Sequence, residues 1–114
     1  MQDLKNIGAW QDTTILIISE FGRTTHENGS QGDPAVGTDH GWGTNTMVLG
    51  GSISAGILGD PPSPSALLDT DIDALAAAVD FRDVYSDIIS WLGVDPLTIF
   101  TEAGYHRASL GIFN

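Results

Sequence analysis

The feature that most restricts the fold is a run of β-branched and aliphatic residues near the N-terminus, TTILIIS, at residues 13–19. Because the run is apolar at consecutive positions, the strand that it predicts needs cover on both faces. Such strands are typical of parallel sheets with helices on each side. The spacing of Leu4, Ile7 and Trp10 predicts the end of an amphipathic helix within residues 1–12. A helix followed by a buried core strand is half of an α/β repeat, so we expect an α/β fold with a mainly parallel sheet.

A polar, glycine-rich segment follows the strand, at residues 20–45, with the sequence EFGRTTHENGSQGDPAVGTDHGWGTN. Ligands of parallel α/β sheets collect beyond the carboxyl ends of the strands. A loop of this length inside a compact domain is usually functional or disordered. We therefore interpret residues 20–45 as a candidate metal-site loop.

Three side chains of this loop are candidate metal ligands: Glu20, Asp39 and His40. Carboxylate and imidazole donors together suit zinc or manganese. They do not complete a four-ligand site, so further ligands must come from elsewhere. The alternative is a glycine-rich turn with hydrogen-bonded side chains. Arg23 is a candidate clamp for an anionic substrate, and its alternative role is an ion pair with Glu27.

The overall charge narrows the range of partners. Four Lys and Arg stand against fifteen Asp and Glu, a formal net charge of −11. This charge repels phosphate backbones, so we expect no nucleic-acid partner. Cysteine is absent, which excludes thiolate metal sites. No apolar run reaches the roughly 20 residues of a transmembrane helix, so we expect no transmembrane segment.

The clearest periodic pattern predicts an amphipathic helix at residues 80–92, DFRDVYSDIISWL. Its apolar residues recur at helical spacing and form one stripe. Asp80 is the expected N-cap, and Gly93 is the expected stop. The stripe predicts a packing element, formed by Phe81, Val84, Tyr85, Ile88, Ile89 and Leu92.

An acidic stretch before this helix raises the possibility of calcium. Asp69, Asp71, Asp73 and Asp80 match acidic positions 1, 3, 5 and 12 of a calcium loop. The turn position of such a loop requires glycine, and this chain has Ala74 there. N-capping and solvated charge are the preferred interpretation.

Three stretches carry a family resemblance: residues 13–43, MVLGGSISAGILGD and DFRDVYSDIISWLGVDP. In that order they resemble the C-terminal part of the bacterial family called domain of unknown function 1501, within the alkaline phosphatase and sulfatase superfamily. The resemblance covers about residues 4–100. It implies that residues 1–114 are a single partial domain, the C-terminal fragment of an alkaline-phosphatase-like, three-layer α/β/α sandwich.

The resemblance also suggests roles for individual residues. Glu20 in SEFG is similar to a strand-end carboxylate that binds one of two metal ions in the superfamily. His40 in TDHG is similar to a ligand of the other ion, with Asp39 as a companion. An alternative alignment places Asp39 and His40 at the strand-end position themselves. Phe21 and Trp42 stand where relatives often carry histidine.

The activity implied by the resemblance is metal-dependent hydrolysis of phosphate or sulfate esters, with an anionic ester as the substrate. The nucleophile and the other ligands of such enzymes lie upstream, so we expect no catalytic nucleophile in this chain and little activity from it alone. The alternative is a non-catalytic binding or structural relative that retains the fold. Relatives are frequently exported, which implies an extracytoplasmic parent protein.

Overall fold

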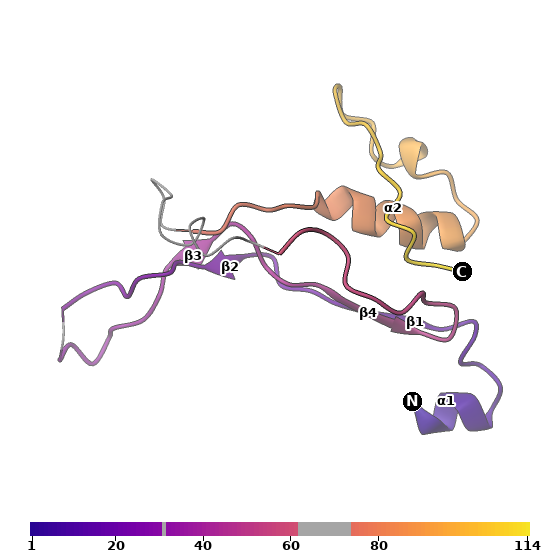
Figure 1. Ribbon diagram of the computed structural model, residues 1–114, viewed down its shortest axis with the longest axis horizontal. Coiled ribbons are helices and arrows are strands. Elements are labelled where there is room, and N and C mark those ends of the chain that lie inside the picture. The colour runs from indigo at the N-terminus through magenta and orange to yellow at the C-terminus, as the bar shows by residue number, and fades with distance from the viewer. Residues whose placement is uncertain (31, 62–73) are drawn as a thin grey trace. The chain divides into compact units, whose positions relative to one another are not determined.

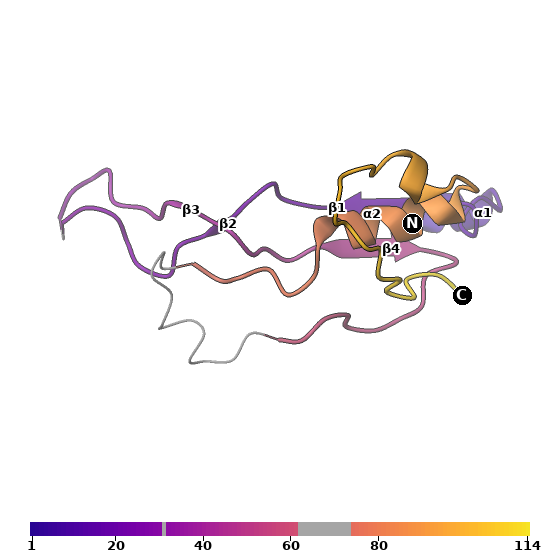
Figure 2. The same cartoon turned by 90° about the horizontal axis from the view of Figure 1, so that it is seen from above.

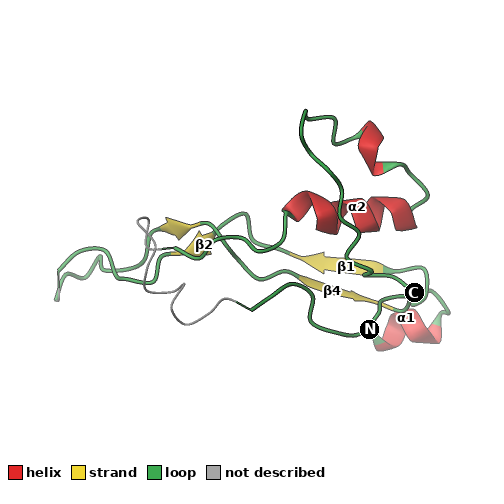
Figure 3. Ribbon diagram, turned by 45° about the horizontal axis from the view of Figure 1, so that its top comes forward, coloured by secondary structure: helices red, strands yellow, loops and turns green. Residues whose placement is uncertain are grey.

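The computed structural model describes residues 1–30, 32–61 and 74–114 (Figure 1). Helices and strands occupy a small share of these residues, and loops connect them (Figure 3). Within the described residues, no helix is long and apolar enough to cross a membrane.

The chain forms two compact units. The first unit comprises Met1–Leu16, Val48–Leu58 and Val79–Asn114. The second comprises Ile17–Met47 and the described part of Gly59–Ala78. The candidate ligands Glu20, Asp39 and His40 all lie in the second unit.

Among the described residues, the regular structure comprises two helices, a 3₁₀ turn and two small sheets. Helix α1 spans Gln2–Asn6 and α2 spans Phe81–Trp91, and a 3₁₀ turn, η2, follows at Pro96–Thr98. Strands β1 (Thr14–Ile17) and β4 (Met47–Gly50) pair with each other. Residues 1–12 therefore contain a helix, and the expected core strand at 13–19 is a four-residue strand whose side chains are half-buried or exposed.

The expected parallel sheet and three-layer sandwich are wrong. In the described residues the sheets are two small antiparallel pairs, β1 with β4 and β2 (Gly22–Arg23) with β3 (His40–Gly41). The β1 and β4 arrows run in opposite directions (Figure 2). A parallel pair needs a crossover, usually a helix, to return the chain to the same end of the sheet. Residues 18–46 contain no helix among those described, and the chain returns in the opposite direction.

The residues predicted to begin and end α2 do so in the structure. The Asp80 side chain accepts a hydrogen bond from the Arg82 amide, which confirms the N-cap. Gly93 follows the helix with a φ of 83°, a left-handed conformation that glycine adopts without steric cost. The helix thus covers Phe81–Trp91, one residue inside each end of the predicted range 80–92.

The buried face of α2, however, is polar. Its buried residues are Asp83, Ser86 and Asp87. Phe81 and Leu92, at the two ends of the apolar stripe, are each 65% exposed. The helix is therefore a packing element, as expected, but it packs through residues that the hydrophobic pattern did not select.

Asp83 and Asp87 hold the C-terminal tail against α2. Asp83 Oδ1 accepts hydrogen bonds from the Tyr105 hydroxyl at 2.7 Å and from the Ala108 amide at 3.0 Å. Asp87 Oδ2 accepts from the amides of Leu110 and Ile112 at 3.1 and 3.2 Å. Asp87 Oδ1 also accepts from Arg107, 3.1 Å away. These bonds satisfy both buried carboxylates.

Two opposing effects set the pKa of Asp87. Burial raises the pKa, but hydrogen bonds from the Ile112 amide, Arg107 and the Leu110 amide outweigh burial, and the net pKa is lowered. The charged form is therefore the one that the folded tail stabilises. The tail also reaches the β4 side of the first unit, because the Ser54 amide donates to the Ile112 carbonyl at 2.8 Å.

We predict that Asp87→Ala lowers the free energy of unfolding of the first unit by about 3–5 kcal/mol, because it leaves Arg107 and two amides without their buried acceptor. Chemical denaturation followed by circular dichroism measures this change. Asp12→Ala removes an exposed carboxylate and is the matched control. A loss equal to that of the control would contradict the anchoring role of Asp87.

The same carboxylate predicts a pH dependence. Because its folded pKa is lowered from the ordinary value of an aspartate, Asp87 stabilises the fold above the unfolded pKa of about 3.9. That contribution is lost as the pH falls through the folded pKa. Denaturation series between about pH 6 and pH 2 should show a drop in stability that is smaller in Asp87→Asn.

Candidate functional site

A short antiparallel hairpin carries two of the candidate residues. Strand β2 (Gly22–Arg23) pairs with β3 (His40–Gly41), with Gly22 opposite Gly41 and Arg23 opposite His40. A Cβ atom at Gly41 would lie 2.6 Å from the Arg23 carbonyl oxygen, closer than real Cβ contacts. Glycine at this position is therefore a condition for the two backbones to approach, and its neighbour His40 is placed by that approach.

Hydrogen bonds extend the hairpin into the loop. The Thr24 amide donates to the Asp39 carbonyl at 3.1 Å, and the Asn28 amide donates to the Gly37 carbonyl at 2.8 Å. The Asn28 side chain closes the same region, since its Oδ1 accepts from the Gly37 amide at 3.0 Å and its Nδ2 donates to Asp39 Oδ1 at 2.6 Å. Within the expected metal-site loop, residues 24–28 and 37–39 are therefore joined by hydrogen bonds, and we call these two joined segments the arm.

A second chain segment covers the base of the hairpin. Thr24 forms an isolated antiparallel bridge with Ala74, which is 1% exposed. The Gly43 amide donates to the Leu75 carbonyl at 2.7 Å. This backbone contact gives the second unit its buried centre.

The structure brings Arg23 and His40 together. Residues directly opposite in an antiparallel pair place their side chains on the same face. The Phe21 ring stacks on the His40 ring with centroids 3.7 Å apart and an interplanar angle of 13°. The Arg23 Cζ lies 5.1 Å from the Phe21 ring centroid, and Arg23 Nη1 donates to the Thr38 carbonyl at 3.0 Å. One face of the hairpin therefore carries an exposed imidazole and an exposed guanidinium around an aromatic ring.

Glu20 and Asp39 do not join this group. The Asp39 side chain is bound by Asn28, whose Nδ2 donates to Asp39 Oδ1. Glu20 is exposed and lies in a bend before the hairpin. Among the described residues, no three His, Cys, Asp or Glu side chains are placed to hold a metal ion.

The calcium alternative falls largely outside the described residues. Asp69, Asp71 and Asp73 lie in the segment that the structure leaves undescribed. Asp80 is described, and its carboxylate binds the Arg82 side chain as well as the Arg82 amide. The Arg82 hydrogen bonds hold the pKa of Asp80 below its usual value. Its observed role is that of an N-cap.

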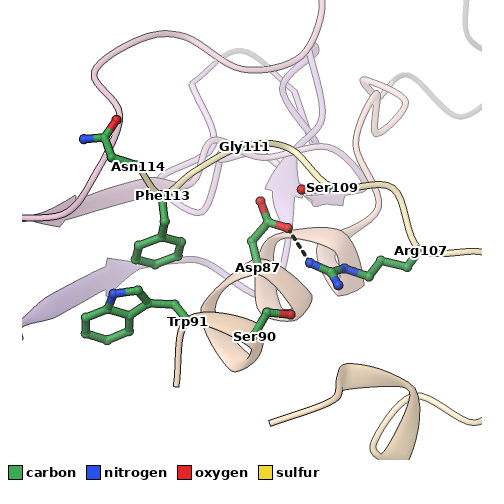
Figure 4. Close-up of a pocket in the computed structure, with 8 residues that line it drawn as sticks. All are labelled: Asp87, Ser90, Trp91, Arg107, Ser109, Gly111, Phe113 and Asn114. Carbon is green, nitrogen blue, oxygen red and sulfur yellow. Dashed lines mark hydrogen bonds and ion pairs between the residues drawn. The ribbon is translucent and has the colours of Figure 1, made fainter. Parts of the chain in front are cut away.

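A shallow pocket lies in the first unit, between α2 and the C-terminal tail (Figure 4). The Trp91 and Phe113 rings stack at its wall, 5.1 Å apart. Arg107 and Asp87 line the pocket side by side and form an ion pair, with Arg107 Nη2 3.1 Å from Asp87 Oδ1. None of the residues singled out as ligands contributes to this pocket.

Comparison with known proteins provides the family. The family described as "protein of unknown function (DUF1501)" matches residues 1–110, nearly the whole chain. The chain belongs to this family. No curated protein and no solved structure matches it.

Membership of the DUF1501 family confirms the family to which the sequence was compared. The match spans the β2–β3 hairpin and α2. The family's own description assigns no activity.

Two residues of the site were not found from the sequence. Phe21 stands where relatives often carry histidine, and its ring contacts both His40 and Arg23. Asn28 carried no pattern of its own, yet it joins the two sides of the arm. The single available signal was its position before Gly29, a pair typical of turns.

We predict that Asn28→Ala loosens the arm, because Asp39 and the Gly37 amide lose their shared partner. Amide hydrogen exchange at Gly37 and Asp39 should accelerate severalfold, with no change at α2. Asn45→Ala, an exposed asparagine in the same unit, is the control. Equal exchange in the two variants would show that Asn28 does not hold the arm.

Proposed function

We propose that this DUF1501 chain is part of a metal-dependent hydrolase of phosphate or sulfate esters, with His40 as a metal ligand and Arg23 as the substrate clamp. The supporting observation is their direct pairing across β2 and β3. Both side chains are exposed on the same face, so one ligand can reach both. The activity itself is inferred from the resemblance of SEFGRT and TDHG to the alkaline phosphatase and sulfatase superfamily.

The chemistry of each side chain suits its proposed role. Within the described residues, neither ring nitrogen of His40 has a hydrogen-bond partner, so either is open to zinc or manganese. Arg23 donates one hydrogen bond to the Thr38 carbonyl. Its remaining N–H groups can bind two oxygens of a phosphate or sulfate group. The guanidinium would hold the ester while the metal, when bound, neutralises its charge.

The described residues supply only part of a coordination shell. His40 offers a nitrogen donor, and Glu20 and Asp39 offer oxygen donors that are not gathered around it. Joining Asp39 to the shell requires exchange of its Asn28 hydrogen bond for a metal bond. The proposal therefore assigns the nucleophile and the missing ligands to other parts of the complete protein.

A non-catalytic role in binding or assembly is the second candidate. The stacked Phe21–His40 pair is a ring contact of the kind that also serves structure alone. Trp42, beside the hairpin, is 71% exposed and offers a large apolar surface. A protein that binds no zinc or manganese but keeps this fold would match the second candidate.

We predict that His40→Ala weakens zinc binding by the complete protein at least tenfold, because an imidazole ligand is lost. Isothermal titration with zinc and with manganese measures the affinities. His106→Ala removes an exposed histidine of the first unit and is the control. Unchanged affinity in His40→Ala would overturn the metal site, and parallel titration of Glu20→Gln and Asp39→Asn would decide between the two alignments.

We predict that Arg23→Ala raises KM for p-nitrophenyl phosphate or p-nitrophenyl sulfate about tenfold or more, the factor expected when a charged hydrogen bond is lost. Arg23→Lys should recover only part of the loss, because lysine cannot bind two oxygens in a planar fork. Steady-state kinetics on the complete, metal-loaded protein measure both. Equal KM in all three proteins would remove Arg23 from the substrate site.

A further inference from the structure

We propose that the pocket between α2 and the C-terminal tail binds a neutral pyranose sugar, with an aromatic wall on one side of the ring and the Asp87–Arg107 ion pair on the other. The pocket has a volume of about 300 Å³, at the lower end of the range for small-molecule sites. Its residues belong to the first unit. The inference therefore goes beyond the proposed function and does not depend on the β2–β3 hairpin.

Trp91 and Phe113 form a flat apolar wall of the pocket. Their rings are nearly parallel, with an interplanar angle of 9° and centroids 5.1 Å apart. At this separation the stack is offset, so neither ring fully covers the face of the other. Both residues are half-buried, which leaves part of the ring surface accessible. One face of a pyranose carries mainly C–H groups, and such a face packs against the electron-rich face of an aromatic ring.

Polar groups lie on the other side of the pocket from the two rings (Figure 4). Arg107 Nη2 donates to Asp87 Oδ1 at 3.1 Å, and the other N–H groups of Arg107 have no acceptor among the described residues. A guanidinium beside a carboxylate thus offers donors and an acceptor next to each other. Adjacent sugar hydroxyls match this arrangement, because each hydroxyl both donates and accepts.

Ser90 adds an unsatisfied hydroxyl to the lining. Its Oγ is buried and has no hydrogen-bond partner among the described residues. Most buried hydroxyls in folded proteins have a partner, and a helical serine often finds one in the carbonyl four residues earlier. Ser90 does not use that carbonyl. A sugar hydroxyl seated against α2 would supply the missing partner.

The charge around the pocket favours a neutral ligand. Arg107 and Asp87 neutralise each other, and the chain carries a formal net charge of −11. That net charge repels an anionic ligand, and Arg107 is already paired. A cationic ligand would compete with Arg107 for Asp87, which also accepts from two backbone amides. A sugar binds through hydroxyl groups and leaves the ion pair intact.

Saturation-transfer difference NMR tests the pocket in the complete protein, with methyl β-D-glucopyranoside as the probe. We expect magnetisation to reach the C–H protons of the sugar ring, and a titration that saturates with a Kd in the millimolar range, because a ligand of this size makes few contacts. Sorbitol has similar hydroxyls but no ring face, so it is the control ligand and should show little transfer.

Variants of the lining locate the binding. Trp91→Leu removes the larger ring of the wall and should weaken binding about three- to tenfold, the factor that one aromatic contact supplies. Trp10→Leu, at a half-buried tryptophan of the first unit outside this pocket, is the matched control. Arg107→Lys keeps the charge but loses the planar set of donors, so it should also weaken binding.

The outcomes decide the inference. Absence of transfer to the glucoside, or equal affinity in the wild type, Trp91→Leu and Arg107→Lys, would overturn it. Benzoate tests the alternative of an aromatic anion: if benzoate binds, loses affinity in Arg107→Lys and the glucoside does not bind, the inference is wrong. Should Trp91→Leu not fold, Arg107→Lys and Ser90→Ala decide, and unchanged glucoside affinity in both would contradict a sugar in this pocket.

Discussion

Two buried carboxylates on one turn of α2 hold the first unit together. Asp83 and Asp87 accept hydrogen bonds from the amides of Ala108, Leu110 and Ile112. An extended tail has backbone donors that need partners when it is buried, and these two side chains provide them. This requirement outweighs the usual preference for an apolar buried face on a helix.

A consequence is that much of the apolar surface stays accessible. Among the described residues the fully buried hydrophobic side chains are Ala74 and Ile112, whereas Ile17, Ile18 and Met47 are about half exposed. A two-stranded sheet is only marginally stable in water without further cover. Polar anchoring, rather than a large hydrophobic core, therefore organises the described part of the chain.

Close backbone approach plays the corresponding role in the second unit. Glycine at position 41 lets β3 approach the β2 backbone, and glycine at position 22 leaves room for the Gly43 carbonyl. The pairing of β2 with β3 sets Arg23 opposite His40. The Phe21 ring then joins them through contacts of 3.7 and 5.1 Å. One face of the hairpin therefore carries an aromatic ring, an imidazole and a guanidinium, and among the described residues Glu20 and Asp39 are not gathered around His40.

The sequence alone determined the family and the strongly local structure. Helix α2, its Asp80 cap and its Gly93 stop follow from interactions within a few residues, so periodicity and capping rules found them. Only the tertiary structure decided the direction in which β1 and β4 pair, the face that α2 buries and the neighbours of His40. Each of these features depends on contacts between residues far apart in the sequence. A local sequence pattern does not indicate which distant backbone group will form a hydrogen bond with it. That is the reason an apolar run at residues 13–19 suggested a parallel sheet and the structure has an antiparallel pair.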